Sequence, residues 1–308
     1  MIRLPAILAL ALGVSACNAE LLPPPAESSQ TIELTGIEAE GLPAQNVTIW
    51  LPREYAQQPE KRFPVLYMWD GQNLLDPEQT QYGKAWMVQD VLEGMVARGE
   101  AEPHIVVGIH SPPGFDRYRV YVPQFVASAE GAIAANVAGM AGGPVASKRQ
   151  LDWVADTLVA RIDSEYRTLA APENRTIAGA SMGGVMSCYA VVARPDTFAD
   201  AGCVSAHFAL VDPELATAHA LQIEKLWDDY LQANLGAPDG RRVWMDHGTE
   251  MLDSYYGPWQ EAVAADFTRL GWKEGEDFTA RVFEGAEHDE NFWHERMPEM
   301  LRWLWRDR

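Results

Sequence analysis

The sequence predicts an α/β protein with a mostly parallel central sheet of about eight strands and helices on both faces. Three observations support this fold class. Short apolar runs such as 64–69 and 105–109 are typical of strands that are covered on both faces. Segments with helical spacing of apolar residues, such as 84–97, lie between these runs. Strands that alternate with helices form parallel sheets, because each helix carries the chain back across the sheet.

The pattern begins with two strands, at 31–37 and 46–51, whose interleaved polar and apolar residues predict an antiparallel pair. Six further strands are predicted at 64–69, 105–109, 175–179, 201–205, 242–246 and 278–283, and helices at 84–97, 151–162, 182–193, 213–232, 258–270 and 292–305. We expect all of them in one domain that spans 31–308. The Gly- and Ala-rich segment 124–150 interrupts the alternation and predicts an irregular insertion over the strand ends.

The composition and the charge limit which classes of partner the protein can bind. The chain has 308 residues, of which 47% are hydrophobic and 22% charged, as in ordinary globular proteins. Its formal charge of −20 repels phosphates, so a nucleic-acid partner is excluded. Nothing in the sequence calls for a cofactor.

The N-terminus predicts export. Residues 1–16 combine a positive charge at Arg3, a short apolar run and small residues before Cys17, as in a signal peptide. The run V-S-A-C resembles the lipobox of bacterial lipoproteins, which implies a lipid on Cys17; the alternative is an ordinary signal peptide. Residues 17–30 then form a flexible tether. We expect the protein in the bacterial cell envelope, held to the membrane only by this lipid.

Two further cysteines, Cys188 and Cys203, leave two interpretations open. In an exported protein they can form a disulfide. They are equally consistent with two buried thiols, because cysteine is among the most buried residue types.

The most informative motif is G-A-S-M-G, centred on Ser181. An apolar strand precedes it and a helical segment follows, which is the context of a nucleophile elbow. Such a sharp turn needs small neighbours, because side chains two positions away on either side would clash. It would place the N–H of Met182 at a helix N-terminus, where it can stabilise an oxyanion.

A nucleophilic serine needs a base and an acid, which follow it in the chain order of this motif. His288 follows the last predicted strand and is the expected base, whereas His294 belongs to the helix behind it. The acid should lie in the loop after strand 242–246, where Asp253 and Glu250 are both candidates. Asp246 is expected to end that strand in a structural role.

The loop after strand 64–69 predicts a second oxyanion donor. It reads D-G-Q-N, in which Gly71 permits close backbone approach and the N–H of Gln72 is the expected donor. The carboxylates of this loop do not follow the spacing of a calcium loop, and H-E-x-x-H is absent near His288, so no metal site is predicted.

These residues resemble the Putative esterase family of α/β-hydrolases, which includes enterochelin-esterase-like and feruloyl-esterase-like enzymes and is related to esterase D and the mycolyltransferases. The resemblance covers about 31–305. It is carried by V-L-Y-M-W-D-G-Q-N (65–73), I-V-V-G-I-H (105–110) with Arg117, R-T-I-A-G-A-S-M-G-G (175–184) and F-E-G-A-E-H (283–288) with Trp293.

The resemblance implies an α/β-hydrolase fold, Ser181 as nucleophile, His288 as base, and the amides of Gln72 and Met182 as oxyanion hole. Members with a D-x-G-T-x-x-L-D-x-x-Y stretch match 246–256 here, which favours Asp253 over Glu250 as the acid. The chain departs from the family at V-Y-V-P (120–123), where a Glu is common. The candidate substrate-binding residues are Asp70, Gly71, Trp86 and His207.

We therefore expect a serine esterase that cleaves carboxylic esters through an acyl-enzyme, and its expected partner is a small-molecule or glycan ester. Two alternatives remain open on the sequence. The first is an acyltransferase, in which an alcohol instead of water attacks the same acyl-enzyme. The second is a non-catalytic surface lipoprotein that binds a glycan or a siderophore.

Overall fold

The computed structural model describes residues 28–80 and 83–307, and it confirms the predicted fold class. An eight-stranded sheet runs through this part of the chain in the order β1-β2-β4-β3-β5-β6-β7-β8. The strands are β1 (Gln30–Ile37), β2 (Gln45–Leu51), β3 (Val65–Trp69), β4 (Ile105–Ile109), β5 (Arg175–Ala180), β6 (Asp200–Val204), β7 (Arg242–Gly248) and β8 (Phe278–Phe283). The pair β1 and β2 is antiparallel, as predicted, and β2 also joins β4 antiparallel. Every pair from β4 to β8 is parallel.

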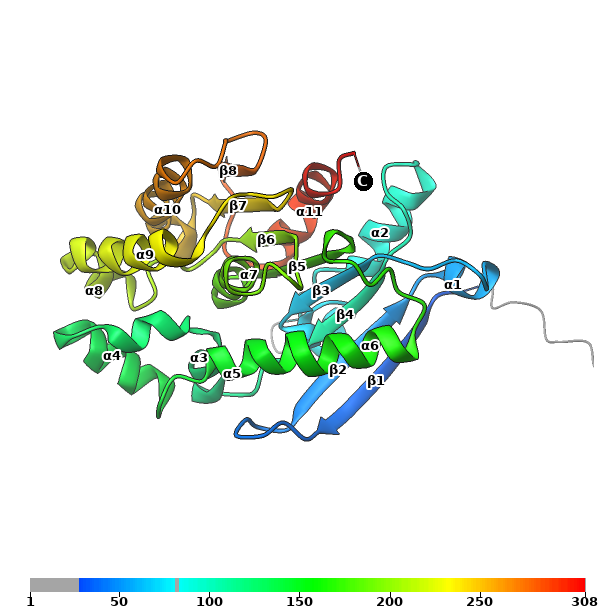
Figure 1. Ribbon diagram of the computed structural model, residues 1–308, viewed down its shortest axis with the longest axis horizontal. Coiled ribbons are helices and arrows are strands. Elements are labelled where there is room, and N and C mark those ends of the chain that lie inside the picture. Colours follow the sequence, from blue (N-terminus) through cyan, green and yellow to red (C-terminus); the bar gives the residue numbers. More distant parts are fainter. Residues whose placement is uncertain (1–27, 81–82, 308) are drawn as a thin grey trace, which may run out of the picture.

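Helices cover both faces of the sheet (Figure 1). They are α1 (Arg53–Gln57), α2 (Val88–Ala97), α3 (Phe115–Tyr121), α4 (Gly131–Ala141), α5 (Ser147–Asp152), α6 (Val159–Glu165), α7 (Met182–Ala193), α8 (Pro213–Ala218), α9 (Ala220–Asn234), α10 (Gly257–Arg269) and α11 (Glu290–Leu304). A π-helical stretch, Trp153–Leu158, joins α5 to α6. Short 3-10 turns include η1 (Gly71–Asn73), η3 (Gln124–Ser128) and η6 (Met251–Tyr255).

The strand period explains why the core divides into two clusters. In β3, Tyr67 and Trp69 pack on one face of the sheet, while Leu66 and Met68 pack on the other. Alternate residues of a strand point to opposite faces, so a run that is apolar throughout must be covered twice. On the second face α2 and α11 lie side by side, and Figure 1 shows this pair at the upper right.

Three predicted helices have different bounds in the structure. The one expected at 151–162 extends over α5, the π-helical stretch and α6, from 147 to 165. The helix expected at 84–97 begins only at Val88, because Met87 adopts a left-handed backbone with φ 48° and precedes the first turn. Trp86 therefore lies in the loop before α2. The helix expected at 213–232 is broken at His219 into α8 and α9.

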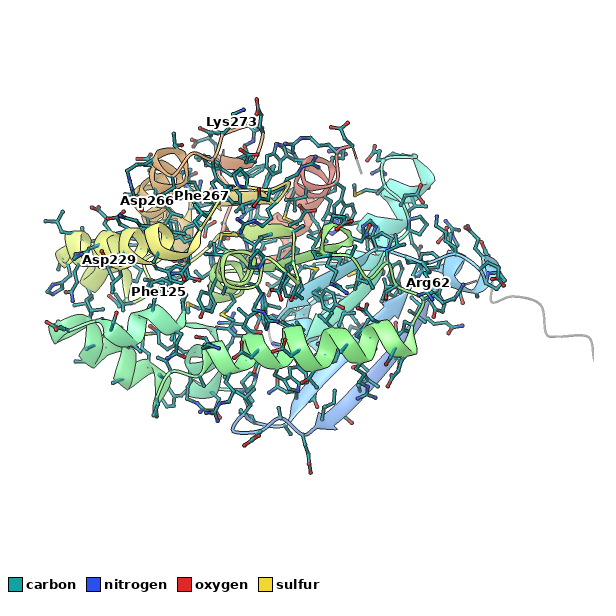
Figure 2. All side chains as sticks on the ribbon, in the orientation of Figure 1. Arg62, Phe125, Asp229, Asp266, Phe267 and Lys273 are labelled. Carbon is teal, nitrogen blue, oxygen red and sulfur yellow. A yellow bond between two sulfur atoms is a disulfide. The ribbon has the colours of Figure 1, made fainter. Side chains whose placement is uncertain are left out.

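The prediction of an irregular insertion at 124–150 was wrong. This segment contains η3, all of α4 and the start of α5. Ile133 and Val137 are four residues apart and lie fully or almost fully buried, at 0% and 5% exposure. Phe125 stacks on Tyr230 of α9 with ring centroids 4.5 Å apart, and Figure 2 shows it between α4 and α9. Alanines and glycines hid this helix, because they carry little hydrophobic contrast along its faces.

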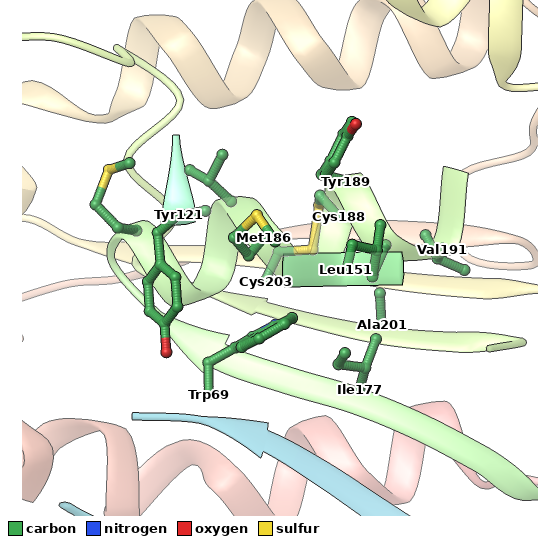
Figure 3. Packing of buried hydrophobic residues seen from close by; sticks show 14 of the residues in the cluster. Trp69, Tyr121, Leu151, Ile177, Met186, Cys188, Tyr189, Val191, Ala201 and Cys203 are labelled. Carbon is green, nitrogen blue, oxygen red and sulfur yellow. A yellow bond between two sulfur atoms is a disulfide. The ribbon is translucent and has the colours of Figure 1, made fainter. Parts of the chain in front are cut away.

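The structure decides the open question about the cysteines. Cys188 of α7 and Cys203 of β6 form a disulfide, drawn as a yellow bond in Figure 3. The bond ties the helix that follows the G-x-S-x-G motif to the neighbouring strand of the sheet.

The predicted signal peptide at 1–16, Cys17 and most of the tether 17–30 lie outside the described residues. Gln30, expected at the end of the tether, is already the first residue of β1. Among the described residues there is no helix that combines the length and the apolar character needed to cross a membrane.

Candidate active site

Ser181 lies at a sharp turn between β5 and α7, as the motif predicts. Its backbone has φ 58° and ψ −123°, a strained conformation for a residue with a side chain. A Cβ on Gly179 would lie 2.9 Å from the carbonyl carbon of Gly183, and one on Gly184 would lie 2.7 Å from the oxygen of Val204. The turn therefore requires these glycines, and Met182 begins the helix, where the N–H has no partner within the helix.

His288 and Asp253 meet beside this turn. The Nδ1–H of His288 donates to Oδ1 of Asp253 over 2.5 Å. Asp253 is fully buried, whereas Glu250, the alternative acid, is exposed at the N-cap position of η6, where its side chain makes no capping hydrogen bond. The structure thus brings Asp253, and not Glu250, to the imidazole.

Backbone contacts between two loops bring this pair together. The N–H groups of Thr249 and Glu250 both donate to the carbonyl of Ala286 over 3.1 Å. A Cβ on Gly248 would lie 2.1 Å from the same oxygen, so only glycine allows the end of β7 to pass this close. The loop that carries the acid is thereby fixed against the loop that carries His288.

Asp253 is held in its charged form despite its burial. Burial acts to raise the pKa of Asp253, but the hydrogen bond and charge of His288 lower it, as do the hydroxyl of Ser205 and the N–H of Gly248. The net effect places the pKa of Asp253 below its ordinary value. A charged carboxylate at this position can orient an imidazole and stabilise an imidazolium.

The loop after β3 forms the opposite side of the site. A Cβ on Gly71 would lie 2.4 Å from the carbonyl carbon of Gly108, so η1 is pressed against β4. Gln72 is clamped by its side chain, which donates from Nε2 to the hydroxyl of Ser111 over 2.9 Å and accepts the Ser111 N–H over 3.1 Å. Gly71 thus serves close packing, while Gln72 lines the site.

Asp70 makes a two-point ion pair with Arg117. The Nε and Nη2 atoms of Arg117 each lie 2.8 Å from one oxygen of the Asp70 carboxylate. Both side chains line the cavity at Ser181, so the pair forms a polar, fixed wall. Asp70 also has a left-handed backbone, with φ 55°.

Tyr256 is a site residue that the sequence reasoning missed. Its hydroxyl hydrogen-bonds to Ser181 and lies 2.8 Å from Nδ1 of His207. His207, expected at the substrate, is not among the residues that line the cavity; it lies behind Tyr256, with its Nε2–H donating to the carbonyl of Val211. In the sequence, Tyr256 is the final tyrosine of the D-x-G-T-x-x-L-D-x-x-Y stretch at 246–256. This match could have singled it out as a site residue.

A cavity of about 870 Å³ opens at Ser181 and His288. Its walls combine aromatic and polar side chains. Trp86 and Trp293 pack with ring centroids 5.5 Å apart and both line it, so Trp86 lies at the cavity although its helix starts later; its role in substrate binding stays a prediction. The exposed side chains of Met251 and Leu252 lie at its rim. A cavity of this size accommodates a drug-sized ligand.

Carboxylates give part of the cavity a negative character. Glu290 is 7% exposed, and its only hydrogen bond from another side chain in the described residues comes from Nδ2 of Asn73 over 3.2 Å. Burial raises the pKa of Glu290, and the nearby charges of Asp289 and Asp70 act in the same direction. Lys84 pairs with Asp289 over 2.7 Å and supplies a cation at the same wall.

Two other histidines after Ser181, His247 and His294, have structural partners. His247 donates from Nδ1 to the carbonyl of Gly248, and His294 donates from Nδ1 to the carbonyl of Trp86 over 2.8 Å. In the part of the chain that the structure describes, no group of three or more His, Cys, Asp or Glu is placed to hold a metal ion.

The sheet order, the strained serine turn and the hydrogen-bonded His288–Asp253 pair are those of an α/β-hydrolase. The chain belongs to the Putative esterase family, whose model matches residues 44–304. This membership places it among the carboxylic ester hydrolases, as the sequence predicts.

A curated relative is similar to part of the chain. An endo-1,4-beta-xylanase/feruloyl esterase from Xylanibacter ruminicola is 26% identical over 164 residues, which are 52% of this chain and 19% of that protein. The chain thus matches about a fifth of the length of this curated relative.

Solved structures share the fold. A ferulic acid esterase has a TM-score of 0.62 at 20% identity, covering 90% of this chain and 97% of its own. An IroE-like serine hydrolase from Shewanella oneidensis has a TM-score of 0.63 at 19% identity, covering 89% and 79%. The enterobactin esterase from Shigella flexneri has a TM-score of 0.62 at 18% identity, covering 91% and 60%.

Proposed function

We propose that this protein is a serine esterase that cleaves carboxylic esters through an acyl-enzyme on Ser181. The observation that carries the proposal is the hydrogen bond from His288 to the buried Asp253, beside a serine held on a strained strand–helix turn. A serine hydroxyl is a weak nucleophile unless an adjacent base removes its proton, and an imidazole oriented by a carboxylate is such a base.

In the first half-reaction, Ser181 Oγ attacks the ester carbonyl while Nε2 of His288 takes the serine proton. Asp253 keeps the proton of Nδ1 in place, so that Nε2 presents its lone pair, and stabilises the imidazolium that forms. The imidazolium then donates its proton to the leaving alcohol as the tetrahedral intermediate collapses. Ser181 is left acylated and the alcohol departs.

The developing oxyanion needs donors that are already in position. The N–H of Met182, at the start of α7, and the N–H of Gln72, in η1, are the proposed pair. The side-chain clamp between Gln72 and Ser111 fixes η1 without using the backbone N–H of Gln72. Each such donor contributes about 3 kcal/mol to transition-state stabilisation in enzymes of this type.

Water completes the cycle by reversing these roles. His288 removes a proton from water, the hydroxyl attacks the acyl carbonyl, and the proton passes to Ser181 Oγ as the acid product leaves. The open cavity of about 870 Å³ gives water access to the acyl group. We therefore favour hydrolysis over transfer to an alcohol.

The cavity fits an ester with both apolar and hydroxylated parts. Met251 and Leu252 offer an apolar rim, while Asp70 and Glu290 offer hydrogen-bond acceptors deeper in the site. Similar proteins are named as a feruloyl esterase and an enterobactin esterase, which also supports an ester substrate. We propose aryl or hydroxyl-bearing esters as the substrate class.

The test of the function compares Ser181→Ala, His288→Ala and the double variant on p-nitrophenyl acetate and on a panel of aryl and sugar esters. Each single change should lower turnover by several orders of magnitude, and the double change should be barely worse, because the two groups act as one unit. A fluorophosphonate probe should label the wild-type protein and not Ser181→Ala. Activity of Ser181→Ala within tenfold of wild type would exclude the serine mechanism.

We also infer that the protein is exported and anchored by a lipid on Cys17. The disulfide between Cys188 and Cys203 supports an oxidising compartment. Cell fractionation tests the anchor: Cys17→Ser should move the protein from the membrane fraction to a soluble one. If both forms stay in the same fraction, Cys17 is not the anchor.

A further inference from the structure

Ser205 lies directly behind the acid of the site. It follows the last residue of β6, is fully buried, and has a left-handed backbone with φ 39°. Its hydroxyl lies 2.5 Å from Oδ2 of Asp253, on the opposite carboxylate oxygen from the one that accepts from His288. No part of the proposed mechanism uses this serine, so its contacts call for a separate explanation.

The hydrogen on Ser205 has only one possible destination. Nε1 of Trp293 donates to Ser205 Oγ over 3.0 Å, and Nη2 of Arg296 donates to it over 2.6 Å. An indole and a guanidinium can only donate, so they occupy both lone pairs of the hydroxyl. The single O–H must therefore donate to Asp253, which as a carboxylate can only accept.

Asp253 is consequently fixed by three donors. Its Oδ2 accepts from the Ser205 hydroxyl and from the N–H of Gly248, which lies 2.6 Å away, while Oδ1 accepts from His288. With both hydrogen bonds of Oδ2 defined, the carboxylate plane is set. The orientation of Oδ1 toward the imidazole follows from it.

Ser205 also stands between two opposite charges. Nη2 of Arg296 lies 2.8 Å from Oδ1 of Asp246 and 3.8 Å from Oδ2 of Asp253. All three charged groups are at most 4% exposed. Within the described residues, Nε and Nη1 of Arg296 have no hydrogen-bond partner, so the guanidinium has unused donors next to the acid.

Arg296 is a potential competitor of His288, because a buried cation in direct contact with Asp253 would share the charge that stabilises the imidazolium. The Ser205 hydroxyl engages one guanidinium N–H, and Asp246 neutralises the charge. Asp246 is itself held by the N–H of Ser205 over 3.1 Å and by Nε1 of Trp244 over 2.6 Å.

We propose that Ser205 is a positioning residue for the His288–Asp253 pair: its hydroxyl fixes Asp253 and keeps the Arg296 guanidinium, 3.8 Å away, from donating a hydrogen bond directly to that carboxylate. This inference rests on the proposed function, because it assigns a role to a residue behind the catalytic acid. It adds Ser205, Arg296 and Asp246 to the residues that determine the basicity of His288.

Removing the Ser205 hydroxyl should impair the action of His288 as the base and leave substrate binding unchanged. In Ser205→Ala, Arg296 Nη2 and Asp253 Oδ2 both lose a partner and are close enough to pair. A guanidinium on Asp253 destabilises the imidazolium, so the acid limb of the kcat/KM profile should move to lower pH by about one unit or more. We expect kcat to fall about ten- to a hundredfold, the usual cost of changes one contact away from a reacting group, with KM within about twofold of wild type.

The test requires that the other charged groups around His288 and Asp253 are the same in the variant and in the wild type. The titratable and charged groups that surround His288 and Asp253 in the described part of the chain include Asp246, Arg296, Tyr256, His207, Glu287, Asp289, Glu290, Asp70 and Arg117. All remain in the variant. A shift of the acid limb of the kcat/KM profile can then be assigned to the missing hydroxyl.

The experiment measures kcat/KM against pH on p-nitrophenyl acetate, and the downfield proton resonance of His288 Nδ1–H without substrate. Ser205→Gly is the second variant, because the left-handed φ of Ser205 suits glycine and the fold should tolerate it. Both variants should move the acid limb to lower pH and shift the resonance upfield. The matched control is Ser147→Ala, a fully buried serine whose hydroxyl has no partner within the described residues.

The outcomes separate this inference from the proposed function. A wild-type profile and resonance in folded Ser205→Ala and Ser205→Gly overturn the inference while leaving the esterase intact. Loss of rate without any shift of the limb or the resonance also overturns it, because that is the result of altered packing. If wild type hydrolyses no ester but the resonance shifts in both variants, the function fails and the positioning role stands.

Discussion

Nδ1 of His288 lies 2.5 Å from Oδ1 of Asp253, although 35 residues separate them in the chain. Their loops follow β7 and β8, which run parallel with Gly248 opposite Phe283. The carboxyl ends of two neighbouring parallel strands therefore deliver the acid and the base to one place. Four predictions follow from this site and its surroundings, each with a measurement that checks it.

Asp253→Asn should lower turnover far more than Glu250→Gln. An amide in place of the carboxylate favours the wrong imidazole tautomer, a loss of up to about four orders of magnitude. Glu250 is exposed and does not contact His288, so its loss should cost less than about tenfold. Steady-state assays at neutral pH measure the turnover of both variants and show which change lowers it more. The reverse order would assign the role to Glu250, and near-normal rates in both would mean a Ser–His dyad.

Tyr256→Phe should speed acylation. Because the Nε2–H of His207 donates to Val211 and the pKa of His207 is lowered by burial to about 4, its Nδ1 is unprotonated at neutral pH and accepts the Tyr256 O–H. The phenol oxygen can then only accept from Ser181, in competition with His288.

Without that hydrogen bond, the burst phase with p-nitrophenyl acetate should be about two- to tenfold faster, as expected from the net 0.5–1.5 kcal/mol of one hydrogen bond. Tyr230→Phe is the control, because its buried hydroxyl has no partner among the described residues. A tenfold slower burst in Tyr256→Phe would instead make the phenol a catalytic donor.

Reduction of the Cys188–Cys203 disulfide should lower the free energy of unfolding and leave the activity intact. The bond closes a loop with a sequence separation of 15, and in the chain-entropy model such a loop is worth about 3 kcal/mol. Urea denaturation with and without reductant measures the difference. The double variant Cys188→Ala/Cys203→Ala should be insensitive to reductant. Equal stability of the oxidised and reduced forms would contradict the prediction.

The protein should lose stability as the pH falls from about 6.5 to about 4. Burial lowers the pKa of His104 and of His207 from 6.5 to about 4. Between these values the unfolded chain binds protons that the folded chain does not, so the free energy of unfolding decreases with falling pH. Urea denaturation across this range measures the slope, which His104→Gln should reduce. A slope of zero in the wild-type protein would show that neither histidine is held neutral.

The sequence by itself determined the parts of the protein that depend on neighbours along the chain. The alternation of apolar runs and helical segments predicted the sheet and its antiparallel start. The glycines around Ser181 predicted a strand–helix turn, because the steric demands of such a turn are met by residues two positions away. His288 could be singled out by its place after the last strand. The helix α4 was missed because alanine and glycine give a weak periodic signal.

The tertiary structure decided every feature that depends on which residues meet across the fold. Asp253 and Glu250 are three residues apart, and only the approach of the β7 loop to Ala286 determines which of them reaches His288. The pairing of Cys188 with Cys203 required α7 to lie on β6. Contacts between parallel strands and their loops depend on sheet order and register, which local patterns do not encode.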